Sequence, residues 1–254
     1  MTSRRVSEIA VSPVQGFRLL HPREVIVGHR GVVENRRFCL IDGNGKRLRS
    51  SATSWTSRVR AEYESELERL TVSFPTGHTV QESALAEGED VLFDLRGRAV
   101  EGRVLDGPWT EPLSDLAGHP VRLVRTVEPG SFREVPATIL SRASLERLER
   151  EAGVTLDPRL FRMLFFLDGC VEHEEDGWSG RRVRVGAATL LVGGPVPRCA
   201  VITRDPDTGE PDIDVLRILK RYREAMSEGG IPFGVYATVE SSGPVRVGDM
   251  VELL

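Results

Sequence analysis

The segment that decides the fold reads Pro-Arg-Cys-Ala at residues 197–200 and Asp-Pro-Asp-Thr-Gly at residues 205–209. Cys199 follows the Gly/Pro-rich stretch 193–197, which predicts a turn that presents the thiol at the mouth of a pocket. There a thiolate would be a soft metal ligand or a sulfur carrier, and Arg198 could hold an anion. The alternative is a buried cysteine at the start of a strand, because free cysteine is often buried. Residues 205–209 predict a tight turn, since they lack the spaced acidic ligands of a calcium loop.

Composition excludes several classes of protein. The 254 residues carry 34 basic and 38 acidic side chains, a net charge of −4, and 40% are hydrophobic, as in globular chains. Without a basic excess, nucleic acid is a poor candidate ligand. The longest apolar run, residues 163–167, is far shorter than the roughly 20 residues of a membrane helix. Because residues 1–6 are basic but no apolar stretch follows them, we expect a cytoplasmic protein without a membrane segment.

The cysteine spacing, the common catalytic motifs and His173 give little further information about function. The three cysteines, Cys39, Cys170 and Cys199, form no C-x-x-C pair, so neither a disulfide framework nor a zinc knuckle is indicated. No phosphate-binding loop, Gly-rich dinucleotide motif or Ser/His/Asp pattern is present. His173 lies among acidic residues and could act as a general acid or metal ligand, although a solvated loop is the commoner explanation.

The first 125 residues read mainly as strands. Residues 38–50 predict a hairpin around the turn Gly-Asn-Gly at 43–45, and residues 70–74 predict a further strand. Residues 112–117, followed by Gly118, predict a short helix, and residues 122–127 return to extended structure.

The second half mixes helical and strand periodicities. A helix is expected to begin after Ser141 and end at Gly153, and another to run from Asp212 or Asp214 to residues 229–230. Strands are expected at residues 161–167, 182–192, 201–203, 235–239 and 245–253, with a turn at 193–197. This pattern predicts a β-rich α+β barrel with a few helices.

Ordered motifs along the chain resemble those of one family. They are Leu-Ser-Arg-Ala-Ser-Leu (140–145), Asp-Gly-Cys (168–170), Glu-Asp-Gly-Trp (175–178), Pro-Arg-Cys (197–199), Asp-Pro-Asp-Thr-Gly (205–209), Phe-Gly-Val-Tyr (233–236) and Val-Gly-Asp (247–249). They resemble the MOSC domain (molybdenum cofactor sulfurase C-terminal), in the branch of the mitochondrial amidoxime-reducing component and its bacterial relatives. The resemblance implies a MOSC-type β-barrel at residues 126–254, preceded by an N-terminal β-barrel-like domain at residues 1–125.

The resemblance also implies a function. It implies a molybdopterin-type molybdenum cofactor, with Cys199 as the catalytic residue that binds molybdenum and with Arg37 and Arg162 as cofactor-anchoring arginines beside Arg198. Relatives of this type reduce small N-hydroxylated or N-oxygenated substrates. Because no flavin or nicotinamide motif is visible, the electrons would come from a partner protein.

Several positions depart from the family pattern. Gln15 and Gly16 stand where the family has lysine and serine, Arg36 stands for an aspartate, and Glu134 and Leu164 replace polar residues of the cofactor pocket, with Met163 beside Leu164. Each missing charge-assisted bond is worth roughly 1.5–3 kcal/mol.

These losses support two alternatives. In the first, the MOSC scaffold serves another reaction in bacterial specialised metabolism, with haem or another metal bound by Cys199 or a histidine such as His173. The haem would lie among Phe161, Met163, Leu164, Phe165 and Phe166, although an apolar run of this kind is more often core. In the second, Cys199 is a sulfur carrier without a cofactor.

Overall fold

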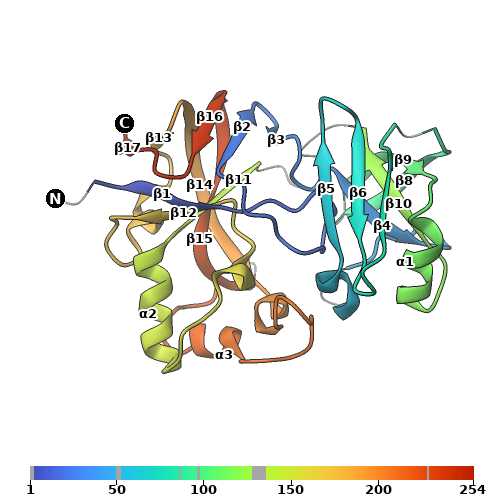
Figure 1. The fold of residues 1–254 in the computed structure, drawn as a ribbon. Helices are drawn as coiled ribbons and strands as arrows, with labels where there is room; N and C mark the ends of the chain where they lie inside the picture. The colour runs from blue at the N-terminus through green and yellow to red at the C-terminus, as the bar shows by residue number, and fades with distance from the viewer. Residues whose placement is uncertain (1–2, 50–52, 86, 96–97, 128–135, 228) are drawn as a thin grey trace.

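The computed structural model describes residues 3–49, 53–85, 87–95, 98–127, 136–227 and 229–254. It is built mainly from strands with a few short helices, so the prediction of a β-rich α+β fold is confirmed. Two strand-rich parts lie side by side in Figure 1, one bearing α2 and α3 and the other bearing α1. No helix among the described residues is long and apolar enough to cross a membrane.

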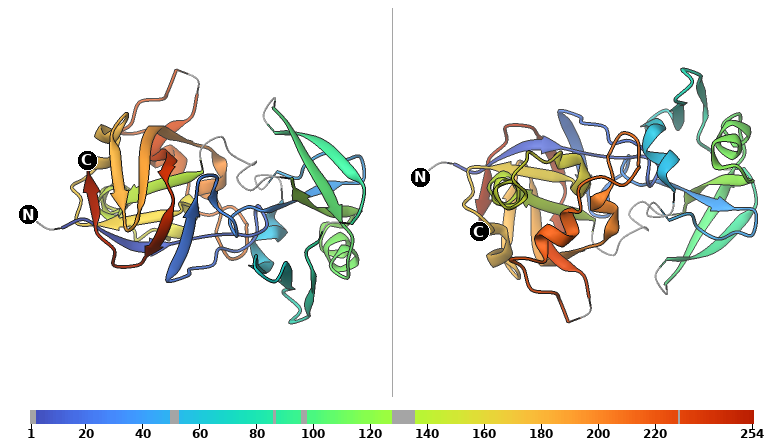
Figure 2. Two further views of the ribbon diagram at one scale, coloured as in Figure 1. Left: turned by 90° about the horizontal axis from the view of Figure 1, so that it is seen from above. Right: turned by 90° about the horizontal axis from the view of Figure 1, so that it is seen from below.

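A seven-stranded sheet forms the larger part. Its order is β1 (Arg5–Ile9), β12 (Phe165–Asp168), β11 (Ala137–Ser141), β15 (Ile231–Ser241), β14 (Ala188–Arg198), β13 (Arg182–Val185) and β17 (Val251–Leu253). The two edges meet, because Arg5 bridges Met250 and the Val6 amide donates to Asp249 O at 2.9 Å. The sheet therefore curls into a nearly closed barrel, which Figure 2 shows from two sides. Alternate side chains such as Ile139, Phe165 and Val235 fill its interior.

The first strands of the chain belong to this part. β1 pairs with β12, and β2 (Glu24–Gly28) lies between β3 (Gly31–Val32) and β16 (Gly243–Arg246) in a small three-stranded sheet. Strand pairing thus crosses residue 125, and the division into domains at 1–125 and 126–254 stays a prediction.

Two antiparallel sheets form the smaller part. One is ordered β4 (Phe38–Asp42), β10 (Val121–Thr126), β9 (Arg98–Leu105) and β8 (Asp90–Leu95). The other contains β5 (Arg60–Glu64), β6 (Arg69–Ser73) and β7 (Thr79–Ser83). Leu123 points into the core between the sheets, whereas its neighbour Val124 joins a second cluster on the opposite face, as strand alternation requires.

Most sequence-predicted helices and turns are confirmed. Helix α1 (Thr110–Ala117) ends at Gly118, whose φ is 72°, and α2 (Arg142–Ala152) ends at Gly153, whose φ is 71°. The Ser141 side chain caps α2 by accepting a hydrogen bond from the Ser144 amide. The predicted hairpin is also present, since Ile41 bridges Arg47 and the Asp42 amide donates to Lys46 O at 2.9 Å.

Four short 3₁₀ helices complete the described elements. They are η1 (Ser54–Arg58), η2 (Pro158–Phe161), η3 (Glu174–Trp178) and η4 (Ala200–Thr203). The expected strand at 201–203 is therefore wrong, because these residues form η4. Helix α3 (Val215–Leu219) starts at the Asp214 cap but ends about ten residues before Gly229, shorter than predicted. Beyond α3, Arg223 pairs with Asp176 of η3 at 2.7 Å. This ion pair holds part of the segment that the sequence pattern had predicted to be helical.

The predicted turn at residues 193–197 is also wrong, because this stretch continues strand β14. β13 pairs with only the first part of β14, so beyond Leu191 one side of β14 carries no partner strand among the described residues. Proline, which has no amide hydrogen to donate, is tolerated at such an edge. The pairing register between β14 and β15 shifts on both sides of Pro195. Such irregularities let the strand continue through the Gly/Pro-rich stretch.

The apolar run at residues 163–167 belongs to the hydrophobic core, which is the commoner position for such a run. Phe165 and Leu167 point into the barrel, while Met163 and Phe166 pack under the helices, and all are at most 2% exposed. Leu164 is equally buried. These side chains therefore do not form the apolar cavity that the haem alternative required.

Gly209 provides a test of how the two parts are packed. Its φ is 74°, and a methyl group there would lie 2.1 Å from Ser54 O, a backbone atom of η1. Gly118 has nearly the same φ, 72°, with open space around it. We expect Gly118→Ala to cost about 1–2 kcal/mol of unfolding free energy from backbone strain. Gly209→Ala should cost clearly more, measured by urea denaturation; equal losses would show that the close approach to Ser54 does not matter.

Candidate functional site

A pocket of about 440 Å³ lies where the two parts meet. The smaller part and the N-terminal loop contribute Gln15, Gly16, Arg36, Lys46, Arg47, Arg49 and Asp94. The barrel part contributes Leu160, Phe161, Arg162, Val196, Pro197, Arg198, Cys199, Val201, Ile202 and Tyr236. The pocket therefore depends on packing between segments that are distant in the sequence.

Cys199 is exposed and lines this pocket, directly after the last residue of β14. Its backbone is extended, with φ −133° and ψ 178°, and its carbonyl accepts a hydrogen bond from the Ile202 amide in η4. The alternative of a buried strand cysteine therefore does not hold. In contrast, Cys39 is fully buried, and burial raises the pKa of the half-buried Cys170 thiol to about 12.

Arg198 fixes the position of the neighbouring cysteine. Its side chain is 7% exposed, and its Nε and Nη2 donate to Phe233 O at 2.9 and 2.6 Å. Nη1 donates to Phe161 O at 2.8 Å, and the guanidinium lies over the Phe161 ring. One buried cation thus ties the end of β14 to β15 and to η2. Because its donors serve main-chain carbonyls, Arg198 is a positioning residue for Cys199.

Two arginines with unusual backbones belong to the cationic wall of the pocket, which is formed by Arg36, Lys46, Arg47, Arg49 and Arg162. Arg36 and Arg162 have φ values of 57° and 49°, the left-handed region that L-residues rarely occupy. Arg36 Nη2 donates to Arg162 O at 3.1 Å, and Arg162 Nη2 donates to Phe17 O at 2.7 Å. Such strain tends to persist where surrounding structure over-determines it, often at functional sites.

The hairpin that follows β4 supplies the rest of the cationic wall. Lys46, Arg47 and Arg49 line the pocket, and Arg47 Nη1 donates to Gln15 Oε1 at 2.9 Å. A guanidinium therefore lies beside the position where the family pattern has a lysine. Sequence reasoning missed these three residues, although the predicted hairpin with basic residues at 46, 47 and 49 was a usable signal.

Two predicted site residues lie elsewhere. Arg37 is not among the residues that line the pocket; its buried side chain lies near Tyr63, Glu68 and Arg125, and burial lowers the pKa of its guanidinium. Its Nε and Nη1 have no hydrogen-bond partner in the described part of the chain. His173, also outside the pocket lining, contacts Arg223 through Nδ1 at 2.9 Å, and burial, followed by the Arg223 charge, lowers its pKa.

Some of the residues that depart from the family pattern line the pocket, and others do not. Gln15 and Gly16 line the pocket, whereas Met163 and Leu164 are core residues that do not. Glu134 lies outside the described residues. Within the described ranges, no three His, Cys, Asp or Glu side chains form a group that could hold a metal ion.

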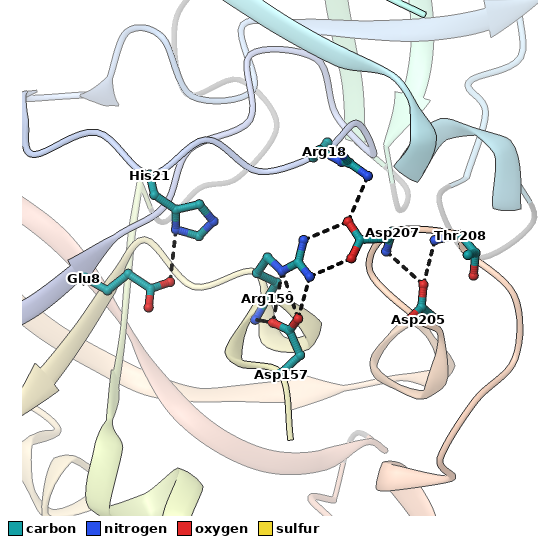
Figure 3. Close-up of polar contacts among 8 residues, drawn as sticks. All are labelled: Glu8, Arg18, His21, Asp157, Arg159, Asp205, Asp207 and Thr208. Atoms are coloured by element: carbon teal, nitrogen blue, oxygen red, sulfur yellow. Dashed lines mark hydrogen bonds and ion pairs between the residues drawn. The ribbon is translucent and has the colours of Figure 1, made fainter. Parts of the chain in front are cut away.

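An ion-pair network holds the loop 205–209 against η2 and the N-terminal loop (Figure 3). Arg159 of η2 donates from two nitrogens to Asp207, at 2.9 and 2.7 Å, and Arg18 pairs with the same carboxylate at 2.8 Å. Arg159 also pairs with Asp157. Asp205 accepts hydrogen bonds from the Asp207 and Thr208 amides, which confirms the predicted tight turn.

Comparison with known proteins identifies the family. The MOSC domain family matches residues 114–252, more than half of the chain. The chain belongs to the MOSC domain family. The MOSC-type fold predicted from the ordered motifs is therefore confirmed.

Named relatives of this MOSC protein are similar over part of their length. The mouse mitochondrial amidoxime-reducing component 1 is 39% identical over 130 residues, which cover 47% of the chain and 36% of the relative. The bovine mitochondrial amidoxime reducing component 2 is 34% identical over 123 residues, covering 46% and 36%. The chain thus spans about a third of these relatives. The YUAD protein from Bacillus subtilis, a solved structure, is 12% identical with a TM-score of 0.49 over 100% of this chain and 96% of that one, too distant to add to the assignment.

The Asp207 network predicts a dependence of stability on pH. Hydrogen bonding from Arg159 holds the pKa of Asp207 below its usual value, so its contribution is present at neutral pH and is lost as the pH falls through the folded-state pKa. Because Asp207 is 44% exposed, we expect Asp207→Asn to cost only about 1 kcal/mol at pH 7. The difference from wild type should shrink below about pH 4.

Urea denaturation at several pH values measures this effect. Asp90→Asn is the control, since it removes an exposed ion pair with Arg103 and should leave stability unchanged. An Asp207→Asn loss that stays constant down to acid pH would contradict the electrostatic explanation.

Arg198→Lys tests the buried guanidinium. A lysine ammonium has no rigid fork and cannot serve Phe233 O and Phe161 O together, so we expect a loss of about 2–3 kcal/mol in unfolding free energy. Arg221→Lys, at an exposed position, is the control and should change little. A stable Arg198→Lys protein would show that Arg198 does not fix this end of β14.

Proposed function

We propose that this MOSC protein binds a molybdopterin-type molybdenum cofactor and reduces small N-hydroxylated or N-oxygenated substrates with electrons from a partner protein. The observation that carries the proposal is the placement of the exposed Cys199 thiol in a pocket with a cationic wall. The similarity to amidoxime-reducing components supports the reaction class.

The described residues fit this cofactor in two respects. Cys199 supplies one soft ligand, which suits a metal whose other ligands come from the cofactor itself. Arg36, Arg47 and Arg162 bring cationic forks to the same pocket, and such forks match phosphate oxygens. The guanidinium of Arg47 beside Gln15 supplies a positive charge next to the position where the family lysine is missing.

Different side chains of this protein would have different roles in binding the cofactor. When bound, the cofactor would supply two-electron redox chemistry for removal of oxygen from nitrogen. Cys199 would hold the metal, while Arg36, Arg47 and Arg162 would orient the anionic end of the cofactor. Arg198 would keep the thiol in place through its bonds to Phe233 O and Phe161 O. The buried, unpartnered Nε and Nη1 of Arg37 favour an anion near that side chain as well.

A sulfur-carrier function is the second candidate, because an exposed cysteine is also what a persulfide requires. The cationic wall favours cofactor binding over the carrier function, because a persulfide on Cys199 would not need the cationic side chains around it. Intact-mass measurement separates the two candidates, because a persulfide adds the mass of one sulfur atom to Cys199.

Metal analysis tests the proposed function. Protein made in a host that supplies the cofactor should contain about one molybdenum per chain, and Cys199→Ala should lose the metal and the activity while keeping the fold. Cys170→Ser is the matched control, because Cys170 lies outside the pocket lining, and it should retain the metal. Activity is measured as reduction of an aromatic amidoxime with a chemically reduced dye.

Two results would overturn the proposal. A wild-type protein without molybdenum would remove the cofactor, and a haem absorbance band would instead favour the alternative cofactor. Unchanged turnover in Cys199→Ala would remove that residue from the site.

A further inference from the structure

The pocket has a strong charge asymmetry. Among its described lining residues, six side chains are cationic and one, Asp94, is acidic, although the whole chain carries a net charge of −4. The cationic residues are Arg36, Lys46, Arg47, Arg49, Arg162 and Arg198. A cleft lined by one sign of charge raises the local concentration of oppositely charged small molecules.

These cations divide into an anchored group and an exposed pair. Arg36, Arg47, Arg162 and Arg198 each donate to a carbonyl or amide oxygen of the protein. Lys46 and Arg49 are exposed, and their side chains make no hydrogen bond or ion pair within the described part of the chain. They therefore remain available to a ligand that enters the pocket.

The local structure of the hairpin keeps this pair at the pocket. Asp42 is the nearest carboxylate in sequence, but its Oδ1 accepts hydrogen bonds from the Asn44 and Lys46 amides, each at 2.9 Å. Asp42 thus stabilises the turn through the main chain. The Ile41–Arg47 bridge and the hydrogen bond from Leu48 N to Leu40 O then fix the segment that leads to Arg49.

We infer that Lys46 and Arg49 form an anion-selecting entrance, so that the small molecule acted on next to Cys199 carries a carboxylate or a comparable anionic group. The reaction of that molecule rests on the proposed function, whereas the anion selection rests on the charge of the pocket. Exposed, flexible cations act through their field and set the preference between an anionic and a neutral molecule of similar shape.

Alkylation of Cys199 measures the selection without the cofactor. Iodoacetate and iodoacetamide react by the same step, in which the thiolate sulfur forms a bond to carbon and iodide leaves. The fraction of thiolate is common to both, so the ratio of their rates reports the preference for the anionic reagent. The measurement uses protein made in a host without molybdopterin, and peptide mapping confirms that Cys199 is the residue modified.

We expect the rate ratio of iodoacetate to iodoacetamide to exceed that of free cysteine by roughly 10-fold at low salt, and to fall as salt is added. The double variant Lys46→Gln/Arg49→Gln should lose most of this excess. Lys220→Gln/Arg221→Gln is the matched control, because it removes the same two charges from exposed positions outside the pocket lining, and it should keep the excess. A ratio that is the same in the double variant and in wild type would overturn the inference.

The cofactor-loaded protein separates two sources of the anionic group. If the entrance selects the substrate, Lys46→Gln/Arg49→Gln keeps its molybdenum. Its kcat/KM then falls for an amidoxime that bears a carboxylate, but not for the same amidoxime with a neutral carboxamide in place of the carboxylate. If the variant instead loses molybdenum, the pair serves the cofactor phosphate, and the assignment to substrate is overturned. Failure of the proposed function has a different signature, since wild type then lacks molybdenum while the alkylation ratio still reports anion selection.

Discussion

The pocket depends on the buried guanidinium of Arg198. A cation at 7% exposure is costly unless its donors are satisfied, and here Phe233 O and Phe161 O accept them. Those carbonyls belong to β15 and η2, so the charge joins three segments at the point where β14 ends. Cys199 is the next residue, and its position in the pocket follows from this bonding.

A second set of contacts joins the barrel part to the N-terminal loop and to η1. Asp207 receives Arg159 from η2 and Arg18 from the N-terminal loop, and Gly209 packs directly on the backbone of Ser54. The motif at 205–209 therefore has a structural explanation: it holds the barrel against the segment that carries η1. The cationic hairpin of the smaller part lines the same pocket as Cys199.

The departures from the family pattern acquire a different meaning in three dimensions. Gln15 has no positive charge, but its amide oxygen accepts from Arg47, which comes from a separate hairpin. Leu164 is buried in the barrel core, and its amide donates to Thr138 Oγ1 at 2.8 Å. Loss of charge at one position is thus accompanied by charge from another segment, which a position-by-position reading of the sequence does not detect.

The sequence by itself determined the elements whose signals are local. Ser141, Gly118 and Gly153 mark helix ends through capping and positive φ, and the ordered motifs identify the MOSC fold. It left open whether Cys199 is exposed or buried, and the structure decided that it is exposed. Only the tertiary structure decided that residues 193–197 continue a strand, because this depends on the free edge of β14. It also decided that Arg36, Lys46, Arg47 and Arg49 share a pocket with Cys199, since burial and long-range pairing bring together residues more than 140 positions apart.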